Sequence, residues 1–214
     1  MEDYDSDEDK TQYEKLMESS HKIKPGMFVS GWDDDVVEEE KNPHETLEKE
    51  ILWAADQNKI NVIHEILKLD PECVNSSDDD QYTPLHRACY NNFTDIATLL
   101  LKYGADPNAR TTMEWTPLHS ACKWSNAQSA ALLLQHGADV NAKSEGSQTP
   151  LHIAATVSNC RNTATVLLMD RNIDANALNV SDETAMDIAR RMGLTYPIFE
   201  MGHDAYKCET GLID

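Results

Sequence analysis

The tetrapeptide Thr-Pro-Leu-His occurs three times along this chain at a constant spacing. Its copies begin at Thr83, Thr116 and Thr149, so each copy starts 33 residues after the one before. A degenerate copy, Thr-Ala-Met-Asp, begins 35 residues later at Thr184, and the apolar stretch 51–55 lies one period upstream of the first copy. Self-similarity at a fixed period of about 20–50 residues indicates a stack of repeated structural units. The sequence therefore predicts five repeats, at about 48–80, 81–113, 114–146, 147–181 and 182–206.

Each repeat has the pattern of two short helices joined by a turn. Thr83 can cap the first helix through its hydroxyl, and the proline after it suits the first helical turn, where a missing N–H costs nothing. Gly104 and Gly137 follow the second helices, where a left-handed C-terminal cap favours glycine, and we expect Asn172 to adopt the same backbone in the fourth repeat. The two extra residues of that repeat fall around 157–162. They should enlarge the turn between its helices.

Charge separates the start of the chain from the repeats. Residues 1–48 carry 16 acidic and 5 basic side chains, a net charge of −11 out of −20 for the whole chain. Like-charge runs with few apolar residues are typical of disorder, so residues 1–42 are predicted to form a disordered acidic tail. The repeat domain should span 43–206 and begin with Asn42 as a helix cap, and 207–214 should form a C-terminal tail.

These features resemble the ankyrin-repeat family. Thr-Pro-Leu-His is close to the tetrapeptide signature of that family's 33-residue repeat, and the strings at 104–109 and 137–142 are similar to the loop after its second helix. Longer strings at 115–124 and 183–191 resemble one particular member of the family. The resemblance implies an all-α solenoid of about five helix-turn-helix repeats with short β-turn fingers. It also implies a regulatory, nuclear or nucleocytoplasmic binding protein without catalysis.

The sequence favours neither a metal site nor an enzyme. Residues one period apart lie on stacked helices about 8–10 Å apart, whereas zinc ligands lie about 2.0–2.3 Å from one ion. We therefore expect His86, His119 and His152 to hydrogen-bond their turns, and the five cysteines to stay free thiols. No GxSxG, GxxxxGKS, GxGxxG or HExxH string is present, so we expect no catalytic residue, cofactor or metal.

Composition and charge indicate where the protein is located and which class of molecule it binds. No stretch holds the roughly 18 consecutive apolar residues of a membrane helix, and the N-terminus lacks a secretion signal, so we expect a nuclear or cytoplasmic protein that is neither secreted nor membrane-bound. The net charge of −20 opposes direct contact with nucleic acid, whose phosphates are bound by Lys and Arg. The expected partner is another protein with a basic patch, bound by a monomer.

The resemblance to ankyrin stacks places the binding face on the finger tips and on the exposed end of each first helix. Tyr82 and Trp115 occupy equivalent tip positions, and Tyr90 and Trp124 lie at the helix ends, so these four rings are expected to form one patch. Trp and Tyr are enriched in binding hot spots; the alternative is that Tyr82 and Trp115 pack on their own turns. The run 78–80 is either a solvated turn or an anionic rim. The expected protein-binding residues are Asp79, Asp80, Tyr82, Tyr90, Asn91, Met113, Trp115, Lys123, Trp124, Glu145 and Gln148.

Two functions stay open from the sequence alone. The first is a non-catalytic protein–protein interaction module, a regulatory adaptor acting in the nucleus or between nucleus and cytoplasm, for instance in transcription, that binds its partner on the aromatic face of repeats 2 and 3. The alternative is an acidic chaperone or nucleic-acid mimic that masks basic proteins through its N-terminal tail. The two differ in which part of the chain, the repeats or the tail, makes the contact.

Overall fold

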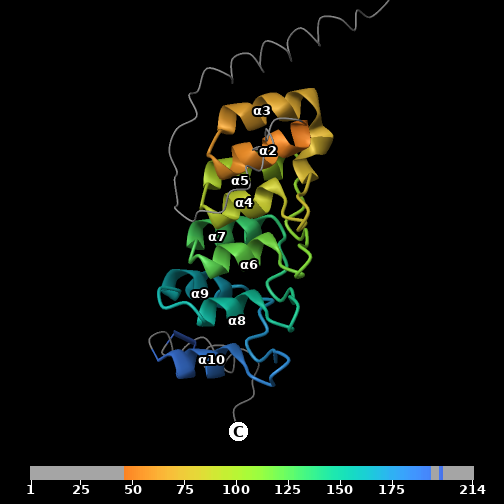
Figure 1. The fold of residues 1–214 in the computed structure, drawn as a ribbon. Helices are drawn as coiled ribbons and strands as arrows, with labels where there is room; N and C mark the ends of the chain where they lie inside the picture. Colours follow the sequence, from red (N-terminus) through yellow and green to blue (C-terminus); the bar gives the residue numbers. More distant parts are fainter. Residues whose placement is uncertain (1–45, 194–197, 200–214) are drawn as a thin grey trace, which may run out of the picture. The chain divides into compact units, whose positions relative to one another are not determined.

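The structure is a computed structural model of the chain and describes residues 46–193 and 198–199. Within these residues every regular element is helical (Figure 1). The predicted tails at 1–42 and 207–214 lie outside the described residues and stay predictions. The helices are α2 (Leu47–Asp56), α3 (Ile60–Leu69), the 3-10 helix η1 (Pro71–Asn75), α4 (Pro84–Tyr90), α5 (Thr94–Lys102), α6 (Pro117–Lys123), α7 (Ala127–Gln135), α8 (Pro150–Ala155), α9 (Arg161–Leu168) and α10 (Ala185–Met192).

The helices form two layers that follow the repeats (Figure 1). The first helices α2, α4, α6, α8 and α10 pack one on the next, and the second helices α3, α5, α7 and α9 form the layer beside them. Fully buried Leu85, Leu118 and Leu151 from the first layer meet Ile96 and Leu133 from the second in one continuous core. The predicted all-α stack of helix pairs is therefore confirmed.

Helices α4, α6 and α8 each begin at a threonine–histidine capping box, whereas aspartate takes the place of histidine at the start of α10. The Thr83 backbone N–H donates to His86 Nδ1 at 3.2 Å, and the Thr83 hydroxyl lies 2.9 Å from the same nitrogen. Since Nδ1 accepts, Nε2 carries the ring proton and donates to the Trp115 carbonyl oxygen of the next repeat at 3.1 Å. His119 bonds Gln148 O in the same way, at 3.0 Å. The histidines thus bond their own turns as predicted, and they also join successive repeats.

The segments before α4, α6, α8 and α10 are β-turn fingers, at residues 78–82, 111–115, 144–148 and 179–183. In the first of these, the Asp78 N–H donates to Tyr82 O at 3.2 Å and the Gln81 N–H donates to Asp78 O at 2.9 Å. Neighbouring fingers are joined through their backbones, as where the Thr112 N–H donates to Asp80 O at 3.0 Å. The residues at the finger tips are therefore held at a fixed spacing.

The ends of the second helices match the prediction at two positions and contradict it at a third. Gly104 and Gly137 have φ of +88° and +84°, the left-handed cap expected of glycine. Asn172 is not among the described residues with positive φ, so that prediction was wrong. Helix α9 ends earlier, at Leu168, and the Asp170 carboxylate then accepts the Asn172 N–H at 2.9 Å. This side-chain turn removes the need for a left-handed residue.

Two smaller predictions concern helix boundaries. The loop between α8 and α9 spans 156–160, whereas the loop between α6 and α7 spans 124–126, so the two extra residues of the fourth repeat do lie between its helices. At the start of the array, α2 begins at Leu47, and the Thr46 hydroxyl caps it by accepting the Lys49 N–H at 3.3 Å. The expected cap, Asn42, lies outside the described residues.

One interface between repeats contains two buried hydroxyl groups without hydrogen-bond partners, those of Ser125 and Thr163. One repeat earlier, Asn92 occupies the position of Ser125, and its Oδ1 accepts a hydrogen bond from Ser129 Oγ at 2.9 Å. Ser129 and Thr163 are both third residues of a second helix, so Thr163 stands where Ser129 does. Because serine is shorter than asparagine, the Ser125 hydroxyl does not bond the Thr163 hydroxyl, and the hydrogen bond equivalent to that between Asn92 and Ser129 is absent.

Ser125→Asn should therefore stabilise the fold by about 1 kcal/mol, because the longer amide can reach the Thr163 hydroxyl. The backbone favours the same change, since Ser125 has φ of 59° and asparagine tolerates this region better than serine. Urea unfolding measured by circular dichroism checks the free energy. Asn92→Ser is the matched control and should lose a similar amount. A Ser125→Asn chain no more stable than the native one would contradict this account.

Candidate functional site

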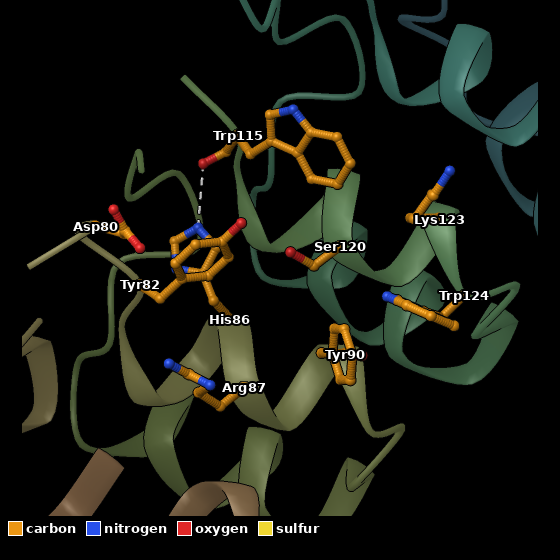
Figure 2. Close-up of a pocket in the computed structure, with 9 residues that line it drawn as sticks. All are labelled: Asp80, Tyr82, His86, Arg87, Tyr90, Trp115, Ser120, Lys123 and Trp124. Carbon is orange, nitrogen blue, oxygen red and sulfur yellow. Dashed lines mark hydrogen bonds between the residues drawn. The ribbon is translucent and has the colours of Figure 1, made fainter. Parts of the chain in front are cut away.

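A pocket of about 380 Å³ lies at the junction of the second and third repeats (Figure 2). It is formed by α4, α6 and the two fingers that precede them. Five of the side chains around it are polar or charged and four are tyrosine or tryptophan, a composition that suits recognition of another molecule. The lining residues are Asp80, Tyr82, His86, Arg87, Tyr90, Trp115, Ser120, Lys123 and Trp124.

The two finger rings, Tyr82 and Trp115, are half-buried against the capping histidines. The Tyr82 ring meets His86 edge-on with centroids 5.6 Å apart, and the Arg87 guanidinium carbon lies 5.6 Å from the Tyr82 centroid. The Trp115 ring lies 6.0 Å from His119. Both rings therefore pack on their own repeats, which was the alternative expectation, while part of each still faces the pocket.

The two helix-end rings, Tyr90 and Trp124, are more exposed. Their centroids lie 4.8 Å apart at an interplanar angle of 61°, and their exposed fractions are 45% and 52%. Asn126 holds the two helix ends together, because its Nδ2 donates to Tyr90 O at 2.8 Å and to Cys89 O at 2.9 Å. The structure thus places all four predicted rings around one pocket (Figure 2). The two finger rings form one group and the two helix-end rings form another.

The run 78–80 divides into one structural and two exposed carboxylates. Asp78 Oδ1 accepts the N–H groups of Asp80 and Tyr82 at 3.0 and 2.8 Å, and Oδ2 pairs with Arg87 at 2.7 Å. Asp78 is therefore occupied in shaping the finger. Asp79 and Asp80 are exposed, and Asp80 alone of the three lines the pocket.

Five of the predicted binding residues do not line the pocket. Asn91 turns toward the first repeat, where its Nδ2 donates to Asp56 Oδ1 at 3.1 Å. Gln148 is half-buried, and its carbonyl accepts the bond from His119. The other three, Asp79, Met113 and Glu145, are exposed on the fingers.

The sequence reasoning missed three lining residues: His86, Arg87 and Ser120. Arg87 and Ser120 follow the histidine of two successive tetrapeptides, so they occupy the same position one period apart. In both helices the side chain at that position lines the pocket. The sequence does contain a signal for this position: it lies on the side of the helix opposite the buried Leu85, and the repeat period then gives the equivalent residue in the next repeat.

The pocket histidine and the buried cysteines of α4 and α6 are poorly suited to acid–base or nucleophilic chemistry. Both ring nitrogens of His86 are hydrogen-bonded, and burial lowers the pKa of His86 to about 4. Burial also raises the pKa of the Cys89 and Cys122 thiols far above the ordinary range, so both stay protonated. Across residues 46–193 and 198–199, no group of three or more His, Cys, Asp or Glu side chains could hold a metal ion. No helix in this described part is long and apolar enough to cross a membrane.

The comparisons with known proteins agree with this architecture. A family model for ankyrin repeats (three copies) matches residues 51–144 and 104–179. Together with the stacked helix pairs and the repeated capping boxes, this match identifies the class: the chain belongs to the ankyrin-repeat family. The resemblance read from the tetrapeptides is therefore confirmed.

Within that family the chain is similar over its whole length to particular relatives. It is 64% identical over 217 residues to ankyrin repeat domain-containing protein 49 of Drosophila melanogaster, with 100% of both chains covered. It is 45% identical to the proteins of the same name from Bos taurus and Homo sapiens, covering 92% and 89% of this chain and 88% and 85% of those relatives. This is the member that the longer strings at 115–124 and 183–191 resembled.

The buried histidines should make folding stability fall in mild acid. The pKa of His86 and of His119 is lowered from 6.5 to about 4, chiefly by burial, so between these values the unfolded chain binds protons that the folded chain does not. The stabilising contribution of the two neutral histidines to the free energy of unfolding is thus fully present above pH 6.5 and is lost as the pH falls toward 4. Between pH 7.5 and 5.0 the free energy of unfolding should drop by about 2 kcal/mol for each of the two histidines.

Urea unfolding at a series of pH values tests this drop. His119→Gln should remove one of the two contributions, because glutamine can take the histidine's place in the capping box but cannot bind the proton. His136→Gln, at an exposed position, is the matched control and should keep the full pH dependence. An unchanged pH dependence in His119→Gln would contradict the assignment.

Proposed function

We propose that this chain is a non-catalytic adaptor that binds another protein at the pocket between repeats 2 and 3. The observation that carries the proposal is the pair of exposed rings, Tyr90 and Trp124, in edge contact at the rim of a concave pocket. Large aromatic side chains left half in water at a concave site are typical of binding hot spots. Membership of the ankyrin-repeat family supports an interaction role, because such arrays present extended concave surfaces.

The available burial is sufficient for specific binding. About half of each ring is exposed, and covering that half would contribute roughly 2–3 kcal/mol per ring. The fixed spacing of the fingers and the hydrogen bonds of Asn126 hold the surface in place before the partner arrives, so little ordering is required on binding. A net charge of −20 would speed encounter with a partner that carries a basic patch.

The proposal is tested with the full-length chain carrying Tyr90→Ala and Trp124→Ala. This variant should lose a specific partner in quantitative affinity capture. Its melting temperature should change little, because both side chains are half-exposed. Met169→Ala with Val180→Ala is the matched control, since these side chains are equally apolar, more exposed and outside the pocket. The same set of captured proteins from all three chains would refute the site.

The acidic tail supports a second candidate, a chaperone or nucleic-acid mimic that masks basic proteins. Its support is the concentration of 16 acidic side chains in residues 1–48. A chain lacking residues 1–40 should keep its partner if the pocket makes the contact. Loss of all binding to basic proteins in that shortened chain, with an intact thermal transition, would favour the tail instead.

We place the adaptor in the nucleus and cytoplasm, acting as a monomer in regulation such as transcription. Cys73, Cys89, Cys122 and Cys160 are buried free thiols, which suits a reducing compartment. Imaging a tagged full-length chain tests the location, and light scattering tests the oligomeric state.

A further inference from the structure

The floor of the pocket carries a hydroxyl group that the protein leaves unused. Ser120 is only 3% exposed and lines the pocket. No hydrogen bond joins its hydroxyl to another group in the described residues, and the oxygen is not among the enclosed atoms without partners, so it opens onto the pocket. In Figure 2 it lies at the centre of the lining, between Tyr82 and Lys123. A hydroxyl group that opens onto a pocket can both donate and accept a hydrogen bond, so it is suited to bonding a ligand.

Two charged side chains stand on opposite sides of this hydroxyl. Asp80 lies on the finger side of the pocket and Lys123 on the helix-end side (Figure 2). Neither has an ion-pair partner in the described part of the chain. The remaining cation of the lining, Arg87, is already paired with Asp78 at 2.7 Å. The pocket therefore offers one free negative and one free positive group, although the chain as a whole is strongly acidic.

The size of the pocket limits what can enter it. A volume of about 380 Å³ is at the small end of the roughly 300–1,000 Å³ that ligand pockets span. The finger rings and the helix-end rings lie on either side of Ser120, so the space between them is lined by apolar surface with one hydroxyl at its base. One apolar or aromatic side chain on an extended segment fits this arrangement, whereas the face of a helix would present several.

We infer that the pocket recognises a short extended segment of a partner protein in which an apolar side chain lies between an acidic and a basic one. The acidic side chain faces Lys123, the basic side chain faces Asp80, and the Ser120 hydroxyl bonds the segment between them. Opposite charges at the two ends fix which way the segment lies. This inference rests on the proposed function and adds the chemistry of the partner.

Peptide selection on the full-length protein tests the inference. A random peptide library should yield sequences with one apolar residue flanked by opposite charges. Lys123→Glu should weaken the selected peptides about tenfold, because it replaces an attraction with a repulsion, and a peptide with that flank changed from acidic to basic should recover the loss. Asp80→Lys should do the same at the other flank. Lys143→Glu, exposed and outside the pocket, is the matched control and should bind like the native chain.

The outcomes separate the inference from the proposed function. Selected peptides that depend on Tyr90 and Trp124 but bind the two charge-reversed variants as well as the native chain would overturn the charge assignment and leave the proposed function standing. A selection that enriches nothing, or peptides that bind equally well after Tyr90→Ala with Trp124→Ala, would overturn both.

Discussion

A buried histidine that bonds in two directions is the interaction on which this array depends. His86 accepts the Thr83 N–H that caps its own helix and donates to the Trp115 carbonyl of the next repeat, and His119 does the same toward Gln148. The first bond starts the helix, and the second fixes the distance to the following finger. Because both nitrogens are used, only the neutral imidazole satisfies the site, so the link is maintained at neutral pH and weakened in acid.

That link also builds the pocket. The carbonyl that His86 holds belongs to Trp115, so the same hydrogen bond that stacks repeat 3 on repeat 2 places the Trp115 ring beside the Tyr82 finger. The helix ends are fixed separately by Asn126, which brings Tyr90 against Trp124. The hydrogen bonds of His86 and Asn126 that hold the repeats together therefore also position the pocket residues. The exposed rings, Asp80 and Lys123 are not required for the stacking and remain available to a partner.

Much of the fold was predictable because a repeated signature carries local instructions that packing does not override. Threonine and proline start α4, α6 and α8, and Gly104 and Gly137 end two second helices as expected. The left-handed cap predicted at Asn172 was wrong, because the Asp170 carboxylate accepts the Asn172 N–H and forms a turn that the helical pattern does not predict. At the site, the period was enough to bring the four rings together. The repeat period could not show that Asp78 forms an ion pair with Arg87 or that Asn91 donates a hydrogen bond to the first repeat. Nor could it show that Ser120 lines the pocket between the rings. These contacts depend on the directions of individual side chains.

The central claim is that a partner contacts the pocket between repeats 2 and 3, and the tryptophan side chains report on it directly. Trp115 and Trp124 line the pocket, whereas Trp53 lies on α2, outside it. Indole N–H signals can be followed by NMR while a selected peptide is added to the full-length protein, with Trp115→Phe, Trp124→Phe and Trp53→Phe used to assign them. The account predicts that the Trp115 and Trp124 signals shift on binding and that the Trp53 signal stays in place. Binding that leaves both pocket signals unmoved would contradict it.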